Sequence, residues 1–192
     1  PMMMAAWKIA APLAAGCSLV LKPSEITPLS TLRMAQLLSD VVPKGVLNVV
    51  HGRGPSIGNH LIHAPQTEVI TVTGSPATGM AAMRAAADQI KHVHLELGGK
   101  SPVIVFDDAD IDTVAETIRY GAFFNAGQDC AQPCRLMVHA SIYDKVVAAV
   151  EDQVKQIQIG APREEGTEMG PIVSQTQRER VEQFVDTAAQ DS

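Results

Sequence analysis

The stretch EVITVTGSPATGMAAMRAAA, residues 68–87, holds a strand, a glycine turn and a helix in immediate succession. Residues 68–73 are rich in β-branched side chains, which is typical of a strand. Gly74 and Ser75 then lead into an alanine-rich segment, residues 76–87, that favours a helix. Parallel sheets are built from strands that alternate with helices in this way. We therefore expect an α/β fold.

The same alternation continues on both sides of this stretch. Further strands are expected at 18–21, 46–50, 92–97, 102–106 and 135–139, and further helices at 2–15, 28–39, 55–63, 111–124, 141–157 and 174–189. Their short connections predict a largely parallel sheet. The double glycine at 98–99 is the best candidate for a boundary between a first domain, residues 1–98, and a second, residues 99–192.

Composition excludes several classes of protein. A hydrophobic content of 46% and a charged content of 19% are typical of a soluble globular chain, and the net charge of −6 argues against a nucleic-acid or membrane partner. The apolar start of the chain is too short to span a bilayer and lacks the basic start of a signal peptide. Three cysteines without zinc or redox spacing favour a reducing compartment, so we expect a cytoplasmic protein.

The first and last residues of the sequence both lie next to expected helices. The sequence starts at Pro1 without an initiator methionine, already within a helical pattern, and stops just after another expected helix. We expect it to be an internal piece of a longer protein.

Two loops that follow expected strands are candidates for ligand binding. The turn Gly74–Gly79 opens a helix whose free N–H groups attract phosphate. It matches neither G-x-G-x-x-G nor a P-loop, and a glycine turn by itself is more often structural. In Lys22-Pro23-Ser24-Glu25 a carboxylate could accept both hydroxyls of a ribose, beside a lysine donor. On this second stretch alone, a plain polar loop is the favoured interpretation.

His92, His94 and Glu96 alternate along one strand, so their side chains share a face. These three residue types could bind a zinc ion. Ligands two residues apart on a flat strand do not converge on one tetrahedral ion, so we expect no metal here.

Asp108, Asp110 and Asp112 resemble the start of a calcium loop. Thr113 stands where such a loop needs glycine, and Arg119 stands where it needs glutamate. The aspartates are better interpreted as caps at a helix start.

The three cysteines differ in context. Cys17 adjoins an expected buried strand and is interpreted as a small core residue. Cys130 ends the polar turn Asn-Ala-Gly-Gln-Asp-Cys, residues 125–130, where an exposed and reactive thiol is expected. Nothing marks Cys134 as its resolving partner.

Together these segments resemble the aldehyde dehydrogenase superfamily. The stretches E-L-G-G-K-S-P (Glu96–Pro102) and N-A-G-Q-D-C (Asn125–Cys130) are highly specific as a pair, with Glu96 and Cys130 34 positions apart. The K-P-S-E loop, the V-T-G-S turn and Gly170-Pro171 also match. The resemblance covers the whole chain, which would be less than half of a family member. It implies a Rossmann-type parallel-sheet domain followed by the start of an α/β catalytic domain.

The resemblance implies a role for particular residues. Cys130 would be the nucleophile that forms a thiohemiacetal with an aldehyde and then a thioester, and Glu96 would be the base for its hydrolysis. NAD is the implied cofactor, with Glu25 disfavouring NADP. The implied cofactor-binding residues are Lys22, Pro23, Ser24, Glu25, Gly54, Gly58, Ser75, Pro76, Ala77, Thr78 and Leu97.

The sequence around Asp129 most resembles that of the aminobutyraldehyde dehydrogenases, so the implied substrate is an amino aldehyde such as 4-aminobutyraldehyde. The family resemblance also implies a homodimer or homotetramer. The alternatives are a semialdehyde dehydrogenase for an anionic substrate and a silent cofactor-binding protein. A CoA-dependent member is disfavoured, because such members generally lack the carboxylate of Glu96. The family's oxyanion asparagine would precede Pro1 by two positions, and its E-x-F-G-P segment would follow Ser192. We therefore expect the chain by itself to be inactive.

Overall fold

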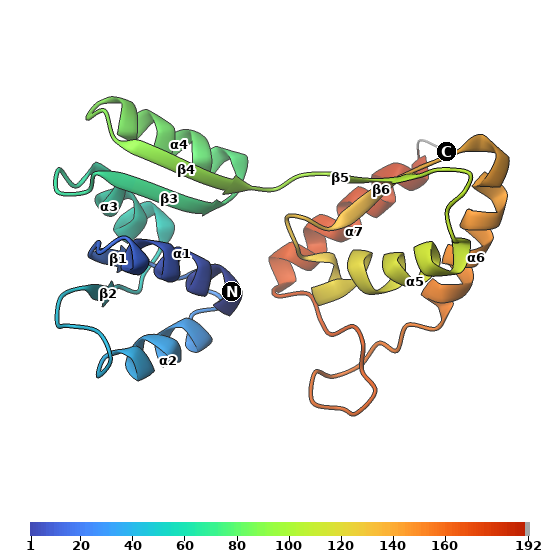
Figure 1. The fold of residues 1–192 in the computed structure, drawn as a ribbon, viewed down its shortest axis with the longest axis horizontal. Helices are drawn as coiled ribbons and strands as arrows, with labels where there is room; N and C mark the ends of the chain where they lie inside the picture. The colour runs from blue at the N-terminus through green and yellow to red at the C-terminus, as the bar shows by residue number, and fades with distance from the viewer. Residues whose placement is uncertain (191–192) are drawn as a thin grey trace. The chain divides into compact units, whose positions relative to one another are not determined.

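The computed structural model of the chain describes residues 1–190. It forms two compact units, Pro1–Leu97 and Gly98–Ser192, each built of parallel strands and helices (Figure 1). The expected α/β class is confirmed. In the described residues the strands are hydrogen-bonded as three separate parallel pairs, β1–β2, β3–β4 and β5–β6, and not as one continuous sheet.

The first unit follows the expected alternation closely. Its elements are α1 (Met2–Ala14), β1 (Leu19–Leu21), α2 (Leu29–Leu38), β2 (Leu47–Val49), a π-helical turn (Gly54–Gly58), α3 (Asn59–His63), β3 (Val69–Gly74), α4 (Pro76–Ala87) and β4 (His92–Leu97). Because β1 pairs with β2 and β3 with β4 in parallel, the carboxyl ends of each pair lie side by side.

Small residues let α4 lie close against the β3–β4 pair (Figure 1). Ala82 and Ala86 are buried against Ile70 of β3. At Gly79 a Cβ atom would lie 2.9 Å from a methyl carbon of Leu97, closer than such atoms approach. Glycine at this position therefore allows the start of the helix to approach the end of β4. The other packed side chains of this core are Ile62, Val72, Val93 and Leu95.

The connection between α1 and β1 differs from the sequence-based expectation at one residue. Gly16 has a φ of 76°, the left-handed conformation that the sequence predicts after α1. Cys17, interpreted as a core residue, is exposed. The reason is that β1 begins only at Leu19, so Cys17 belongs to the surface turn and not to the strand.

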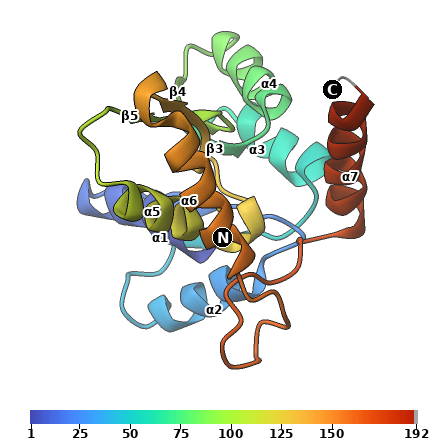
Figure 2. The ribbon, with the colours of Figure 1, turned by 90° about the vertical axis from the view of Figure 1, so that its right-hand side faces the viewer.

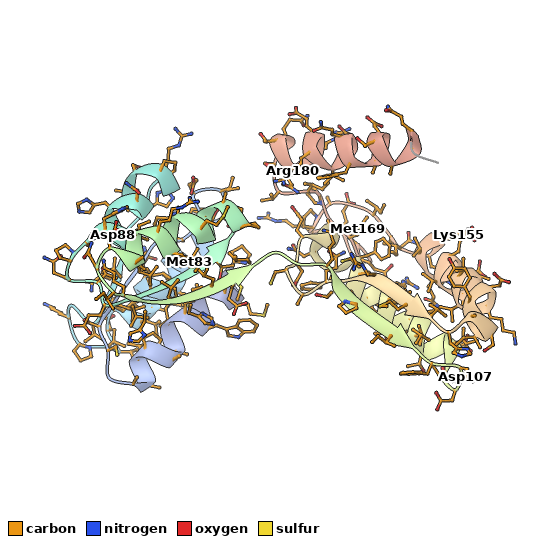
Figure 3. The ribbon with its side chains drawn as sticks, turned by 90° about the horizontal axis from the view of Figure 1, so that it is seen from above. Met83, Asp88, Asp107, Lys155, Met169 and Arg180 are labelled. Carbon is orange, nitrogen blue, oxygen red and sulfur yellow. The ribbon has the colours of Figure 1, made fainter. Side chains whose placement is uncertain are left out.

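The second unit repeats the pattern of strand and helix. Its elements are β5 (Ser101–Val105), α5 (Ile111–Ala122), a short 3₁₀ turn (Phe124–Gly127), β6 (Pro133–Val138), a second 3₁₀ turn (Ala140–Ile142), α6 (Tyr143–Lys155) and α7 (Gln175–Gln190). The buried residues of this unit are Val105, Ala115, Ile118 and Val146. The helix α7, which carries Arg180, buries no residue and stands apart from α5 and α6 (Figures 2 and 3).

Asp110 caps the start of α5, as the sequence predicts for this acidic stretch. Its Oδ1 accepts a hydrogen bond of 2.7 Å from the backbone N–H of Thr113. The first backbone N–H groups of a helix have no partner within it, so this bond satisfies one of them.

Arg119 on α5 ties the loop after α6 to the body of the second unit. Its Nη2 atom lies 2.8 Å from both carboxylate oxygens of Glu168, and its Nη1 atom donates to the side chains of Gln153 and Gln156. Glu168 also accepts the backbone N–H of Gln158. Hydrogen bonding from Arg119, and then from Gln158, lowers the pKa of the Glu168 carboxyl below its ordinary value of 4.5.

Replacing Glu168 with glutamine should therefore lower the unfolding temperature of the chain by a few degrees at pH 7. A carboxyl whose pKa is lowered by folding stabilises the folded state while it is ionised, and this contribution is lost as the pH falls through the folded pKa. The difference between wild type and Glu168→Gln should thus shrink below about pH 4.5, the ordinary value. Thermal unfolding from pH 7 to pH 3 measures it. The matched control is Glu165→Gln in the same loop, and an equal effect of both variants would contradict the prediction.

Candidate active site

The loops after β1 and β2 meet at Lys22. Its Nζ atom donates to the carbonyl oxygens of Pro23 (2.8 Å) and Gly52 (3.2 Å), which joins the two loops at the carboxyl ends of neighbouring parallel strands. Gly58 packs on the same side chain, since a Cβ there would lie 3.7 Å from the Cε atom of Lys22. This corner brings together residues that the sequence separates by more than thirty positions.

Glu25 presents its carboxylate at this corner. The Oε2 atom lies 3.6 Å from the Nζ atom of Lys22, and Glu25 lines a surface hollow with Arg53, Pro55 and Ser56. The backbone N–H of Glu25 itself, then the charge of Lys22 and the backbone N–H of Gly54, lower the pKa of the carboxyl. An ionised carboxylate beside an ammonium group can bind the paired hydroxyls of a sugar.

Ser75 forms the amino end of α4 directly after β3. Its Oγ atom accepts the backbone N–H of Thr78 at 3.3 Å, and the two hydroxyl oxygens lie 3.1 Å apart. Ser75, Pro76, Ala77 and Thr78 are exposed, and the first turn contains no acidic residue. The positive end of the helix dipole is therefore open to an anion.

Glu96 and Leu97 end β4. They lie opposite Thr73 and Gly74 of β3, at the carboxyl edge of the pair. An oxygen of the half-exposed Glu96 carboxylate lies 3.3 Å from Nε2 of His94, which shares its face of the strand. Within residues 1–190 no group of three or more histidine, cysteine, aspartate or glutamate side chains is placed to hold a metal ion.

Cys130 is exposed at the end of a left-handed turn in the second unit. Asn125, Ala126 and Gly127 have φ values of 52°, 54° and 73°, and only the last is a glycine. Left-handed backbone at two non-glycine residues costs energy that surrounding contacts must supply. Gly99 packs against this turn, because a Cβ atom there would lie 3.6 Å from the carbonyl oxygen of Cys130.

Gln128 supplies much of that support. Its side chain donates to the carbonyl oxygen of Asn125 and accepts the backbone N–H of Val173 at 2.9 Å, while Asn125 donates back to the carbonyl oxygen of Gln128. Gln132 donates to the carbonyl oxygen of Ala122 on the other side of the turn. In the sequence, only the spacing of these two glutamines within a polar turn indicates such a role, and this signal is too weak to identify them.

The structure groups the candidate residues in four places. Lys22 to Glu25 meet Gly54 and Gly58 at the first corner, Ser75 to Thr78 open α4, and Glu96 and Leu97 end β4. These three groups belong to the first unit, and Cys130 belongs to the second.

Residues 1–192 match the model of a family described as the aldehyde dehydrogenase family. The chain belongs to this family. It is 45% identical over 189 residues to the chloroplastic betaine aldehyde dehydrogenase of Amaranthus hypochondriacus, and 44% identical to the peroxisomal aminoaldehyde dehydrogenase 2 of Pisum sativum. In both comparisons 98% of this aldehyde dehydrogenase chain is aligned, and it spans 38% of the length of the relative.

Solved structures show the same likeness. Betaine aldehyde dehydrogenase of Staphylococcus aureus in complex with NAD⁺ matches 100% of this chain with a TM-score of 0.95 and 41% identity, over 38% of that protein. An aldehyde dehydrogenase of Pseudomonas syringae in complex with NAD⁺ and octanal matches 96% of the chain with a TM-score of 0.91 and 38% identity, again over 38% of that protein.

The expectation of a cytoplasmic protein is wrong. The Amaranthus hypochondriacus relative is named as a chloroplastic protein and the Pisum sativum relative as a peroxisomal one. The physical reason is that unpaired cysteines argue only against oxidising compartments and do not separate the remaining ones. Within residues 1–190 no helix has both the length and the apolar character needed to cross a membrane.

Proposed function

We propose that this aldehyde dehydrogenase chain carries the nucleophile, the base and part of the cofactor site for NAD-dependent oxidation of an aldehyde to a carboxylic acid. The observation that supports this most is an exposed thiol at the end of a left-handed turn, in a chain that matches this family over its whole length. The chain spans 38% of the length of its relative from Amaranthus hypochondriacus. The activity is therefore to be assayed in the complete gene product.

Cys130 performs the covalent chemistry in this proposal. Its thiolate adds to the aldehyde carbon, which forms a C–S bond, and its backbone N–H stabilises the oxygen of the adduct. Bound NAD⁺ supplies the acceptor for the hydride that leaves this carbon. The thioester that remains on Cys130 holds the substrate at the oxidation level of the acid.

Glu96 acts on that thioester. Its carboxylate takes a proton from water, and the water oxygen adds to the thioester carbon. The C–S bond then breaks, so Cys130 leaves as a thiolate and the carboxylic acid is released. A half-exposed carboxylate is suited to this task, because the attacking water can reach it and the proton it takes up can pass on to solvent.

The residues present fit a dinucleotide. Lys22, Pro23, Ser24 and Glu25 offer a carboxylate and an ammonium group for a ribose, with Gly54 and Gly58 beside them. The residues proposed for the pyrophosphate are Ser75, Pro76, Ala77 and Thr78, and the backbone of Leu97 is proposed to face the nicotinamide end.

Replacing Glu25 with glutamine should raise the preference for NADP relative to NAD roughly five- to tenfold, because charges a few ångströms apart interact by about 1 kcal/mol in water. The carboxylate disfavours a 2′-phosphate, and its loss also frees the charge of Lys22. The ratio of kcat/KM for the two cofactors measures this. Asp40→Asn, an exposed acidic residue of the same unit, is the control. An unchanged ratio in Glu25→Gln would remove Glu25 from the ribose site.

An amino aldehyde is the proposed substrate class. Relatives named aminoaldehyde and betaine aldehyde dehydrogenases support it, and Asp129 places a carboxylate next to the nucleophile. Initial rates with 4-aminobutyraldehyde, betaine aldehyde and a carboxylate-bearing semialdehyde test the proposal. We expect the two cationic aldehydes to have the higher kcat/KM. Preference for the anionic one would favour the semialdehyde alternative, and NAD binding without any turnover would favour the silent one.

We further propose a homodimer or homotetramer for the complete gene product. Val181, Phe184 and Val185 of α7 are exposed, and a second copy would cover such apolar side chains. Sedimentation equilibrium tests this, and a monomer at micromolar concentration would exclude it.

A further inference from the structure

A line of polar side chains crosses one face of the first unit and ends at Glu96. The Nζ atom of Lys8, on α1, lies 2.6 Å from Oγ1 of Thr71 on β3. The same Oγ1 atom lies 3.3 Å from Nδ1 of His94 on β4. The Nε2 atom of His94 lies 3.3 Å from Oε1 of Glu96. Four side chains from three elements thus form one continuous set of contacts.

The folding pattern explains this alignment. His94 and Glu96 are two residues apart on one strand, so they share a face, and Thr71 lies directly opposite His94 in the parallel register. Lys8 reaches the strands from α1, which is anchored by the buried Ala5 and Ile9. Partial burial lowers the pKa of Lys8, and the negative charge of Glu96 opposes this effect. The two residues at the ends of the line therefore interact electrostatically.

The chemistry of these groups allows one direction of hydrogen bonding. A lysine ammonium group can only donate, so Thr71 accepts from Lys8 and its own hydroxyl proton is free to be donated to Nδ1 of His94. A neutral histidine that accepts at Nδ1 carries its proton at Nε2. The Nε2 atom that carries this proton lies 3.3 Å from Oε1 of Glu96.

We propose that His94, held in this tautomer by Thr71, is a positioning residue for Glu96. The polar contact with Oε1 restricts the carboxylate and leaves Oε2 to accept a proton from water. The pair is exposed, so it contributes little to stability and its effect lies in orientation. This inference rests on the proposed role of Glu96 as the base.

The kinetic test uses the complete gene product and separates the first equivalent of NADH from steady turnover. In His94→Leu the first equivalent should form at the wild-type rate, and steady turnover should fall about tenfold, as expected for the loss of one polar contact with a charged group. His94→Gln keeps an N–H donor and should recover most of the loss. The matched control is His92→Leu, the same residue type on the same face, with no contact to Glu96 among the described residues. Equal losses in the two leucine variants, or a parallel fall of both phases in His94→Leu, would overturn the proposal.

A second measurement on the chain itself needs no activity. Side-chain ¹⁵N spectra of its histidines at neutral pH should show a larger Nε2–H fraction for His94 than for His92. Thr71→Val should reduce this fraction to that of His92, and Thr71→Ser should preserve it. Equal fractions in wild type overturn the positioning role even if the enzyme is active. A fixed His94 tautomer in a protein without aldehyde oxidation would overturn the proposed function instead, and the positioning role of His94 with it.

Discussion

Replacing Cys130 with alanine is expected to lower NAD-dependent aldehyde oxidation by several powers of ten, because the covalent route is lost entirely. Cys130 is the exposed thiol at the end of the left-handed turn, and Gly99 packs against its carbonyl group. The turn is held by Gln128, whose contacts do not involve the thiol. Alanine should therefore leave the shape of the turn intact, so the loss is chemical.

The control for this variant is Cys134→Ala. Cys134 is a free and exposed cysteine four residues further on, in β6. It should retain wild-type turnover measured as NADH absorbance with 4-aminobutyraldehyde. Near-normal turnover in Cys130→Ala would refute the assignment of the nucleophile, and a large loss in Cys134→Ala would transfer it to the second thiol.

Replacing Glu96 with glutamine should produce a different defect of similar size in steady turnover. The amide cannot accept the proton of water, so the thioester on Cys130 accumulates. The first equivalent of NADH should form at the normal rate, after which turnover should fall by about 10²–10⁴-fold, the usual contribution of a general base. Rapid mixing followed by NADH absorbance resolves the two phases.

Glu68→Gln, an exposed glutamate just before β3 in the same unit, is the control and should leave both phases unchanged. If the first phase fell together with turnover in Glu96→Gln, Glu96 would act before the thioester forms, as the activator of the thiol. A normal second phase would remove Glu96 from the chemistry.

Local patterns predicted most of the secondary structure. The β-branched run before Gly74 and the alanines after Ser75 lie in β3 and α4, and the turn at Gly16 has the expected left-handed φ. These features depend on neighbours within a few residues, which a sequence displays directly. The position of Cys17 was missed because β1 starts at Leu19, one residue later than expected, a difference too small for an apolar run to resolve.

Contacts between distant residues could not be predicted in this way. The pairing of strands into separate parallel pairs, the bond from Val173 to Gln128 and the approach of Lys8 to Thr71 join positions far apart in the sequence. No periodicity encodes such pairs, because they depend on how whole elements pack. His94 is an example. Its spacing from His92 and Glu96 along one strand is visible in the sequence, but its contact with Thr71 on the neighbouring strand is not.

The bond between Gln128 and Val173 has a consequence for biosynthesis. The two residues are 45 positions apart, so this bond to the turn that carries Cys130 cannot form until the ribosome has made and released the chain beyond Val173. At about 5–20 residues per second, synthesis of that stretch takes roughly 2–9 seconds. During this interval the nascent thiol lacks the contact that shapes its turn. A chain terminated before Val173 would therefore retain Cys130 and the local bonds of its turn, and yet lack the bond that ties this turn to the later part of the unit.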